Sequence, residues 1–116
     1  MKVLVVDDDR VLVDLIASVL QDAGYLVQTA CNGREGLDQL IADPPDLVLL
    51  DLHMPVMDGL TFFRLLKQRE ESDTMPVVLM SADGSQVAPL FGSGCFLSKP
   101  FDLDNLLSCV RMNLKQ

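Results

Sequence analysis

Three unbroken runs of four apolar residues constrain the fold more than any other feature of this sequence. They are VLVV at 3–6, LVLL at 47–50 and VVLM at 77–80. None of them alternates apolar with polar residues, as a strand with one solvated face would. Such runs are typical of strands that are buried on both faces of a parallel sheet. Two shorter apolar runs, at 25–27 and 95–97, extend the predicted sheet to five strands.

The segments between these runs mostly carry apolar residues at helical spacing. This spacing predicts helices over 11–20, over 37–41, around 62–66 and over 103–114, the last with Asp102 as its N-cap. Gly24 and the proline pair at 44–45 are stop signals for the first two helices. Right-handed crossovers would then place helices on both faces of the sheet. We predict a flavodoxin-like, doubly wound α/β fold with parallel strand order 2-1-3-4-5, in one domain over residues 1–116.

The gap at 82–94 breaks this pattern, because it has three glycines and a proline in thirteen residues. Inside a helix, glycine and proline cost about 1 and 3 kcal/mol relative to alanine. We therefore predict a loop, or at most one or two turns around 86–91, where a full helix would otherwise join the fourth and fifth strands.

Charge and cysteine content narrow the class of protein. Seventeen acidic residues against nine lysines and arginines give a formal charge of −8. This balance disfavours binding of nucleic acid or of an anionic membrane surface by the domain itself. No apolar run approaches a membrane span, and acids follow the first run where a signal peptide would have small residues. The three cysteines, at 31, 95 and 109, are scattered, and we interpret them as reduced, buried thiols of a cytosolic protein.

Reactive side chains follow four of the five predicted strands. In open α/β sheets, function is located at the carboxyl ends of the strands. Carboxylates held together there raise one another's pKa, and a hard divalent cation such as Mg²⁺ relieves their repulsion. A carboxylate beside this cation can attack phosphorus, while a lysine and a hydroxyl share the charge of the transferring group. The residues are Asp7, Asp8 and Asp9 after the first strand, Asp51 after the third, Ser81 after the fourth and Lys99 after the fifth.

Each of these residues alone also fits a structural role. Acids after a strand can simply begin a helix, since they favour a helix N-terminus. An aspartate can likewise belong to a turn, a serine can be an N-cap, and a lysine can be surface charge. The phosphoryl-transfer interpretation depends on these residues occurring together, at the ends of four of the five predicted strands.

Four motifs, VLVVDDDR, DLVLLDLHMPVMDG, VVLMSA and FLSKPF, occur in this order along the chain. Together they resemble the receiver domain of two-component response regulators, of the chemotaxis-regulator type, and the resemblance spans the whole chain. It implies a cytoplasmic signalling switch rather than an enzyme. A histidine kinase or a histidine phosphotransfer protein would phosphorylate it, and its conformational change would control a downstream target that the sequence does not identify.

The resemblance also implies a phosphoacceptor and a metal site. Asp51 would accept the phosphoryl group. Asp8 and Asp51 would bind Mg²⁺ directly, together with the backbone carbonyl of His53, and Mn²⁺ could take the place of Mg²⁺. Asp7 would act on the metal through a bound water.

The remaining implied roles belong to the switch. Lys99 would pair with the phosphoryl oxygens, and its bond to Pro100 is expected to be cis. Ser81 would bind the phosphoryl group and move toward it, and Phe96 would rotate inward as Ser81 moves. A short segment at 82–94 would leave this chemistry intact but alter the surface that many family members use for output.

Two other interpretations remain open from the sequence. A haloacid-dehalogenase-type phosphohydrolase also forms an aspartyl phosphate, but it normally has a second aspartate where this chain has His53. A pseudo-receiver would keep the fold as an interaction module without switching. The chain could also be a separate protein or one part of a longer regulator.

Overall fold

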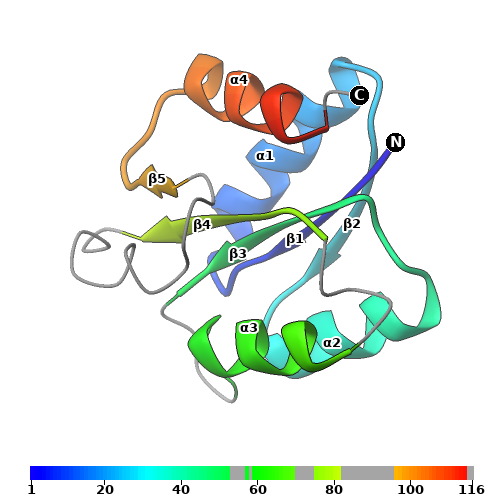
Figure 1. Cartoon of the computed structure of the whole chain (residues 1–116). Coiled ribbons are helices and arrows are strands. Elements are labelled where there is room, and N and C mark those ends of the chain that lie inside the picture. Colours follow the sequence, from blue (N-terminus) through cyan, green and yellow to red (C-terminus); the bar gives the residue numbers. More distant parts are fainter. Residues whose placement is uncertain (53–56, 58, 70–74, 82–95, 115–116) are drawn as a thin grey trace.

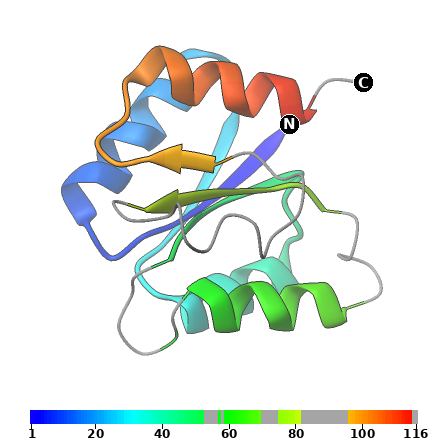
Figure 2. The same ribbon diagram turned by 60° about the vertical axis from the view of Figure 1, so that its left-hand side comes forward.

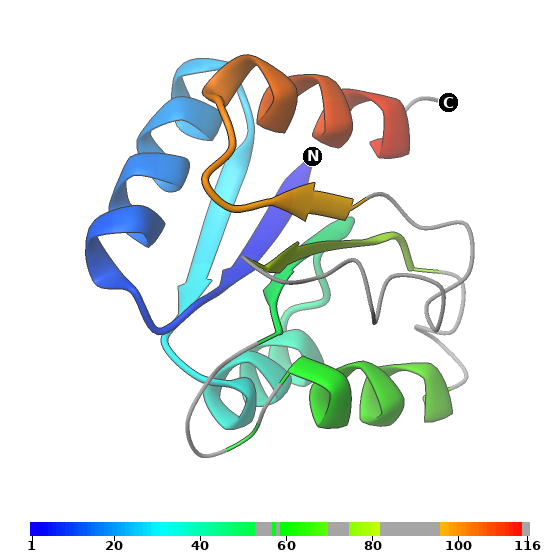
Figure 3. The same cartoon turned by 90° about the vertical axis from the view of Figure 1, so that its left-hand side faces the viewer.

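The computed structural model describes residues 1–52, 57, 59–69, 75–81 and 96–114. Its five strands form one parallel sheet in the order β2-β1-β3-β4-β5. Helices α1 and α4 cover one face of this sheet, and α2 and α3 cover the other (Figures 1, 2 and 3). The predicted doubly wound fold and strand order are therefore confirmed. The strands are β1 (Lys2–Val6), β2 (Leu26–Ala30), β3 (Leu47–Asp51), β4 (Val77–Ser81) and β5 (Phe96–Ser98), and the helices are α1 (Arg10–Asp22), α2 (Gly33–Ala42), α3 (Gly59–Gln68) and α4 (Leu103–Leu114).

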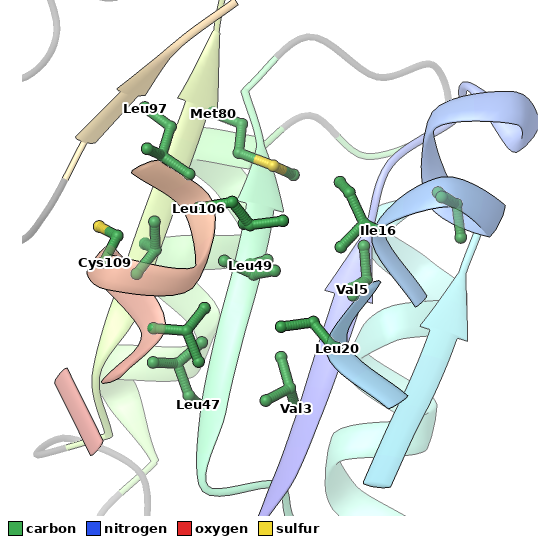
Figure 4. Close-up of a cluster of buried hydrophobic side chains, with 13 residues drawn as sticks. Val3, Val5, Ile16, Leu20, Leu47, Leu49, Met80, Leu97, Leu106 and Cys109 are labelled. Carbon is green, nitrogen blue, oxygen red and sulfur yellow. The ribbon is translucent and has the colours of Figure 1, made fainter. Parts of the chain in front are cut away.

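Successive residues of the central strands point to opposite faces of the sheet, and both faces are buried. In β1, Val3 and Val5 belong to the apolar cluster beneath α1 and α4, while Leu4 and Val6 belong to the cluster beneath α2 and α3. The same alternation continues in β3 and β4. Figure 4 shows Ile16 and Leu20 of α1 and Leu106 of α4 packed over the first of these clusters. This double burial explains the absence of polar alternation in the apolar runs.

All five strands differ by at least one residue from the predicted runs, and β2 differs most. The edge strand β2 extends to Ala30, past the predicted end at residue 27, because its polar part pairs with β1, with Thr29 opposite Val5. An edge strand needs only one buried neighbour, so its apolar signal is weaker than that of a central strand. Strand β4 includes Ser81, and β5 begins at Phe96. The segment 82–94, with its predicted loop, lies outside the described residues.

The two described cysteines have different states. Cys31 is a free thiol, as expected, but it is half-buried rather than buried. The expectation of a reduced thiol is wrong for Cys109 on α4, which is disulfide-bonded. Cys109 is buried in the cluster beneath α1 and α4.

Local signals at the helix ends are confirmed. Gly24 follows α1 with a φ of 99°, a left-handed conformation that favours glycine. Asp102 caps α4 as predicted, by accepting a hydrogen bond from the Asn105 amide. Asn32, which was not among the predicted caps, accepts the Glu35 amide at the start of α2. Among the described residues, no helix has both the length and the apolar character needed to cross a membrane.

Candidate functional site

The register of the sheet brings the predicted site residues to one edge. Val6 of β1 pairs with Leu50 of β3, so the residues that follow, Asp7 and Asp51, lie beside each other. On the other side of β3, Ser81 ends β4 and pairs with Ser98 of β5. The Lys99 amide donates a hydrogen bond to the Ser81 carbonyl at 2.9 Å, which fixes where the lysine side chain begins.

Three carboxylates converge at this edge. One oxygen from each of Asp7, Asp8 and Asp51 lies within 4.8 Å of the others. Asp7 is 0% exposed and Asp51 is 4% exposed, whereas Asp8 is open to solvent. Burying two carboxylates side by side is costly unless cations or hydrogen-bond donors compensate their charge. A set of carboxylate oxygens open on one side suits Mg²⁺, which binds a few protein oxygens and keeps several waters. The donor set therefore fits the predicted cation.

Lys99 supplies the positive charge that faces two of these acids. Its Nζ donates a hydrogen bond to Asp7 Oδ2 at 2.8 Å and lies 3.4 Å from Asp51 Oδ1. Burial alone would lower the pKa of the Lys99 ammonium. The hydrogen bond and charge of Asp7, together with Asp51, outweigh this effect and raise the pKa above its ordinary value. Lys99 is therefore a fixed cation at neutral pH.

The two residues of the expected switch lie on neighbouring strands. Ser81 is fully buried at the end of β4. Phe96 is half-buried on β5, opposite Leu79, and packs against the apolar cluster beneath α2 and α3. The bond between Lys99 and Pro100 is cis, as expected. His53, whose carbonyl is the remaining expected metal ligand, lies outside the described residues.

A close contact that the sequence did not indicate lies beside this site. A Cβ atom built on Gly33, the first residue of α2, would lie 2.7 Å from the backbone oxygen of Met57. A side chain there would collide with the connection that follows Asp51. A glycine at the start of a helix is only a weak signal of such a contact, because capping alone also explains it.

A polar cavity of about 240 Å³ borders the acidic site on the β2 side. Its lining includes Asp7, Arg10, Asp14, Cys31 and Glu35. The hydrogen bond from the Cys31 thiol to Glu35 raises the pKa of this thiol. Cys31 is therefore a poor nucleophile at neutral pH, and the reactive groups of this edge are the carboxylates and Lys99.

Comparison with known proteins is consistent with this geometry. Residues 3–111 match the family model described as the response regulator receiver domain. The chain belongs to this family. The fold of this receiver domain is similar to that of the chemotaxis protein CheY4 of Vibrio cholerae, with 32% identity, a TM-score of 0.90 and coverage of 97% of this chain and 98% of the other. The receiver domain of NtrX from Brucella abortus has 30% identity and a TM-score of 0.89, with 98% of each chain covered.

Curated relatives of the receiver domain are longer proteins. The response regulator MprA of Mycolicibacterium vanbaalenii is 40% identical over 99% of this chain and 51% of its own length. The DNA-binding dual master transcriptional regulator RpaA of a Synechocystis strain is 36% identical over 99% of this chain and 49% of its own length. The chain thus spans about half the length of these relatives.

Proposed function

We propose that this receiver domain, residues 1–116, is a signalling switch that is phosphorylated on Asp51. The observation that carries the proposal is the placement of Lys99, whose ammonium contacts both Asp7 and Asp51 beside a third carboxylate, Asp8. A nucleophilic carboxylate, a place for a hard cation and a fixed ammonium are the parts that phosphoryl transfer to a carboxylate requires. Membership of the receiver family supports the assignment.

Each residue has a defined task in this proposal. An Asp51 oxygen attacks the phosphorus of the donor, the bond to the donor's nitrogen or oxygen breaks, and the donor leaves with its electron pair. Asp8 and Asp51 would hold Mg²⁺ with the carbonyl of His53, and Asp7 would hold one of its waters. When bound, the cation neutralises charge on the phosphoryl oxygens. The Lys99 ammonium, 3.4 Å from Asp51, would share that charge.

The proposed switch depends on the negative charge that phosphorylation would add to the site. A phosphoryl group on Asp51 would add about two negative charges and three strong acceptor oxygens. The Ser81 hydroxyl and the Lys99 ammonium lie at the neighbouring strand ends and can donate to these oxygens. Movement of Ser81 would free space for Phe96 to turn inward from its half-buried position. Phosphorylation would thereby favour one of two conformations and control a downstream target.

The donor we propose is a histidine kinase or a histidine phosphotransfer protein, acting in the cytoplasm. Its phosphohistidine must reach Asp51, so the donor must dock beside the acidic edge. Val11 and Leu15, one turn apart on α1, are 81% and 46% exposed. An apolar cavity of about 290 Å³ lined by Leu12, Lys99, Pro100 and Phe101 lies close by. Exposed apolar residues beside the reaction centre are suited to binding a partner protein.

Incubation with acetyl phosphate and Mg²⁺, followed by intact-mass measurement, tests the chemistry. We expect the wild type to gain one phosphoryl group and Asp51→Asn to gain none. EDTA should abolish the gain. A wild type that gains no phosphate, or an Asp51→Asn variant that gains as much, would contradict the proposal; the first outcome is the one expected of a pseudo-receiver.

The exposed position of Val11 gives a second test, which separates the donor from the chemistry. Val11→Asp should slow transfer from a phosphorylated histidine phosphotransfer protein at least tenfold, because it places charge in the docking surface. It should leave phosphorylation by acetyl phosphate unchanged, since Val11 is solvent-exposed. Asp104→Asn, an exposed change on α4, is the control. Equal rates of protein-to-protein transfer for Val11→Asp and the wild type would remove α1 from the docking surface.

A further inference from the structure

Asp9 connects the first helix to the acidic site through its own backbone. Its side chain is the N-cap of α1 and accepts a hydrogen bond from the Leu12 amide at 3.2 Å. Its carbonyl accepts the Val13 amide at 2.9 Å. Its amide donates to Asp7 Oδ1 at 2.9 Å. The residue therefore belongs to the helix and also holds a buried carboxylate of the site.

These contacts leave Asp7 no freedom to turn. One oxygen, Oδ1, accepts the Asp9 amide, and the other, Oδ2, accepts the Lys99 ammonium at 2.8 Å. Asp7 is fully buried, so its carboxylate is not in contact with bulk water. If the Asp9 amide moved away, the carboxylate would lose one partner and would rotate about its side chain. Lys99 would then follow its remaining partner away from Asp51.

The helix behind Asp9 is itself firmly anchored. Ile16 and Leu20 of α1 are 0% exposed and pack into the cluster beneath α1 and α4. The cap transmits that fixed position to the start of the helix, because a capped first turn does not fray. The orientation of Asp7 thus depends on a hydrogen bond that is outside the acidic cluster and faces solvent.

We infer that Asp9 is a positioning residue, whose capping hydrogen bond orients Asp7 and, through Asp7, places Lys99 beside Asp51. The expected effect on phosphorylation rests on the proposed function. The expected effect on the orientation of Asp7 and Lys99 does not require a phosphoryl group. The hydrogen bonds of Asp9 in the described residues are with Asp7, Leu12 and Val13. Its carboxylate acts as an acceptor for an amide, so a neutral acceptor of the same shape should replace it.

The test compares three variants. Asp9→Ala removes the cap, whereas Asp9→Asn keeps an equally good cap and removes only the charge. Asn32→Ala removes the cap of α2, which accepts the Glu35 amide at 2.8 Å and has no link to Asp7. All three are compared by Mg²⁺ titration, phosphorylation by acetyl phosphate, thermal unfolding and hydrogen exchange of the residue 9 amide without metal.

We expect Asp9→Ala to weaken Mg²⁺ binding and slow phosphorylation about fivefold, the factor that corresponds to a lost cap. Hydrogen exchange of the residue 9 amide should also be about fivefold faster. Asp9→Asn should stay within about twofold of the wild type in all three measurements. Asn32→Ala should lower the melting temperature as Asp9→Ala does, but leave Mg²⁺ binding unchanged.

Three outcomes would overturn the inference. The first is Mg²⁺ binding by Asp9→Ala within twofold of the wild type. The second is a loss in Asp9→Asn as large as in Asp9→Ala, which would make charge rather than capping the cause. The third is an equal loss in Asn32→Ala, which would make it a general effect of stability. A wild type that binds Mg²⁺ but gains no phosphate would contradict the proposed function, while the exchange and metal measurements would still decide the role of Asp9.

Discussion

Strand β1 has a lysine–aspartate ion pair at each of its two ends, and the two pairs differ in burial. At its amino end, Lys2 pairs with Asp43, whose side chain is 60% exposed. At its carboxyl end, Asp7 pairs with Lys99, and the Asp7 side chain is 0% exposed. An exposed pair contributes little to stability, whereas a buried carboxylate needs its partner. The same two residue types therefore form a surface contact at one end and a reactive centre at the other.

The difference also lies in what surrounds each pair. Lys2 and Asp43 have the polar neighbours Asp46 and Gln28, which donate or accept at the surface. Lys99 and Asp7 have two further carboxylates, Asp8 and Asp51, whose oxygens lie within 4.8 Å of Asp7. Within the described part of the chain, one ammonium faces three carboxylates at this edge, an excess of negative charge that a divalent cation can neutralise. The excess of acid at one end, rather than the ion pair itself, marks the functional edge.

The largest expected contrast is in stability. In EDTA at neutral pH, Lys99→Met should lower the free energy of unfolding by about 3 kcal/mol, because it removes the ammonium that faces two buried carboxylates. Lys2→Met should lower it by less than about 1 kcal/mol. Urea unfolding followed by circular dichroism measures both. Equal losses in the two variants would mean that burial does not distinguish the pairs.

The second contrast concerns metal. Mg²⁺ at ten times its dissociation constant should stabilise the wild type by about 1.4 kcal/mol, since it binds only the folded state. Asp8→Asn should lose this gain, because it removes the negative charge of a carboxylate at the metal site. Asp43→Asn, a matched change in the exposed pair, should keep it. Thermal unfolding with and without Mg²⁺ gives the answer, and stabilisation of Asp8→Asn equal to that of the wild type would exclude Asp8 as a ligand.

The smallest contrast is in the response to salt. At low ionic strength, Asp43→Asn should cost about 0.5 kcal/mol, and in 1 M NaCl this cost should nearly vanish because exposed charges are screened. The cost of Lys99→Met should persist in the same salt, since its carboxylates are buried. Urea unfolding at the two salt concentrations measures both costs. A salt-independent cost for Asp43→Asn would show that the amino-end pair is more than a surface contact.

Much of the arrangement at the carboxyl ends of the strands could be predicted from the sequence. The apolar runs locate the strands, and the strand order determines which strand ends are neighbours. The apolar runs predict β1 and β3 as buried neighbours, and neighbouring parallel strands bring Asp7 and Asp51 together. The end of β2 was missed because an edge strand tolerates polar residues such as Gln28 and Thr29. Strand pairing alone therefore predicts the meeting of the acids but not the full extent of the sheet.

The hydrogen-bond partners and the distances between side chains in the site could not be predicted. Lys99 lies nearer to Asp7 than to Asp51. The Asp9 amide donates a hydrogen bond to Asp7. Both contacts depend on the path of the backbone after each strand. The contact of Gly33 with Met57 depends on how α2 docks beside the connection that follows β3. These contacts join segments that are far apart in the sequence, and the hydrophobic periodicity of each segment does not predict the distance between them.

The central claim is that the carboxyl end of β1, and not its amino end, is part of a switch. The most direct measurement is the change in amide NMR shifts when Mg²⁺ and beryllofluoride, a mimic of the phosphoryl group, are added to the protein. We predict large shifts at Asp51, Ser81, Phe96 and Lys99, and none at Lys2 or Asp43. Shifts that are absent at Ser81 and Phe96, or that are as large at Lys2 as at Lys99, would contradict the account.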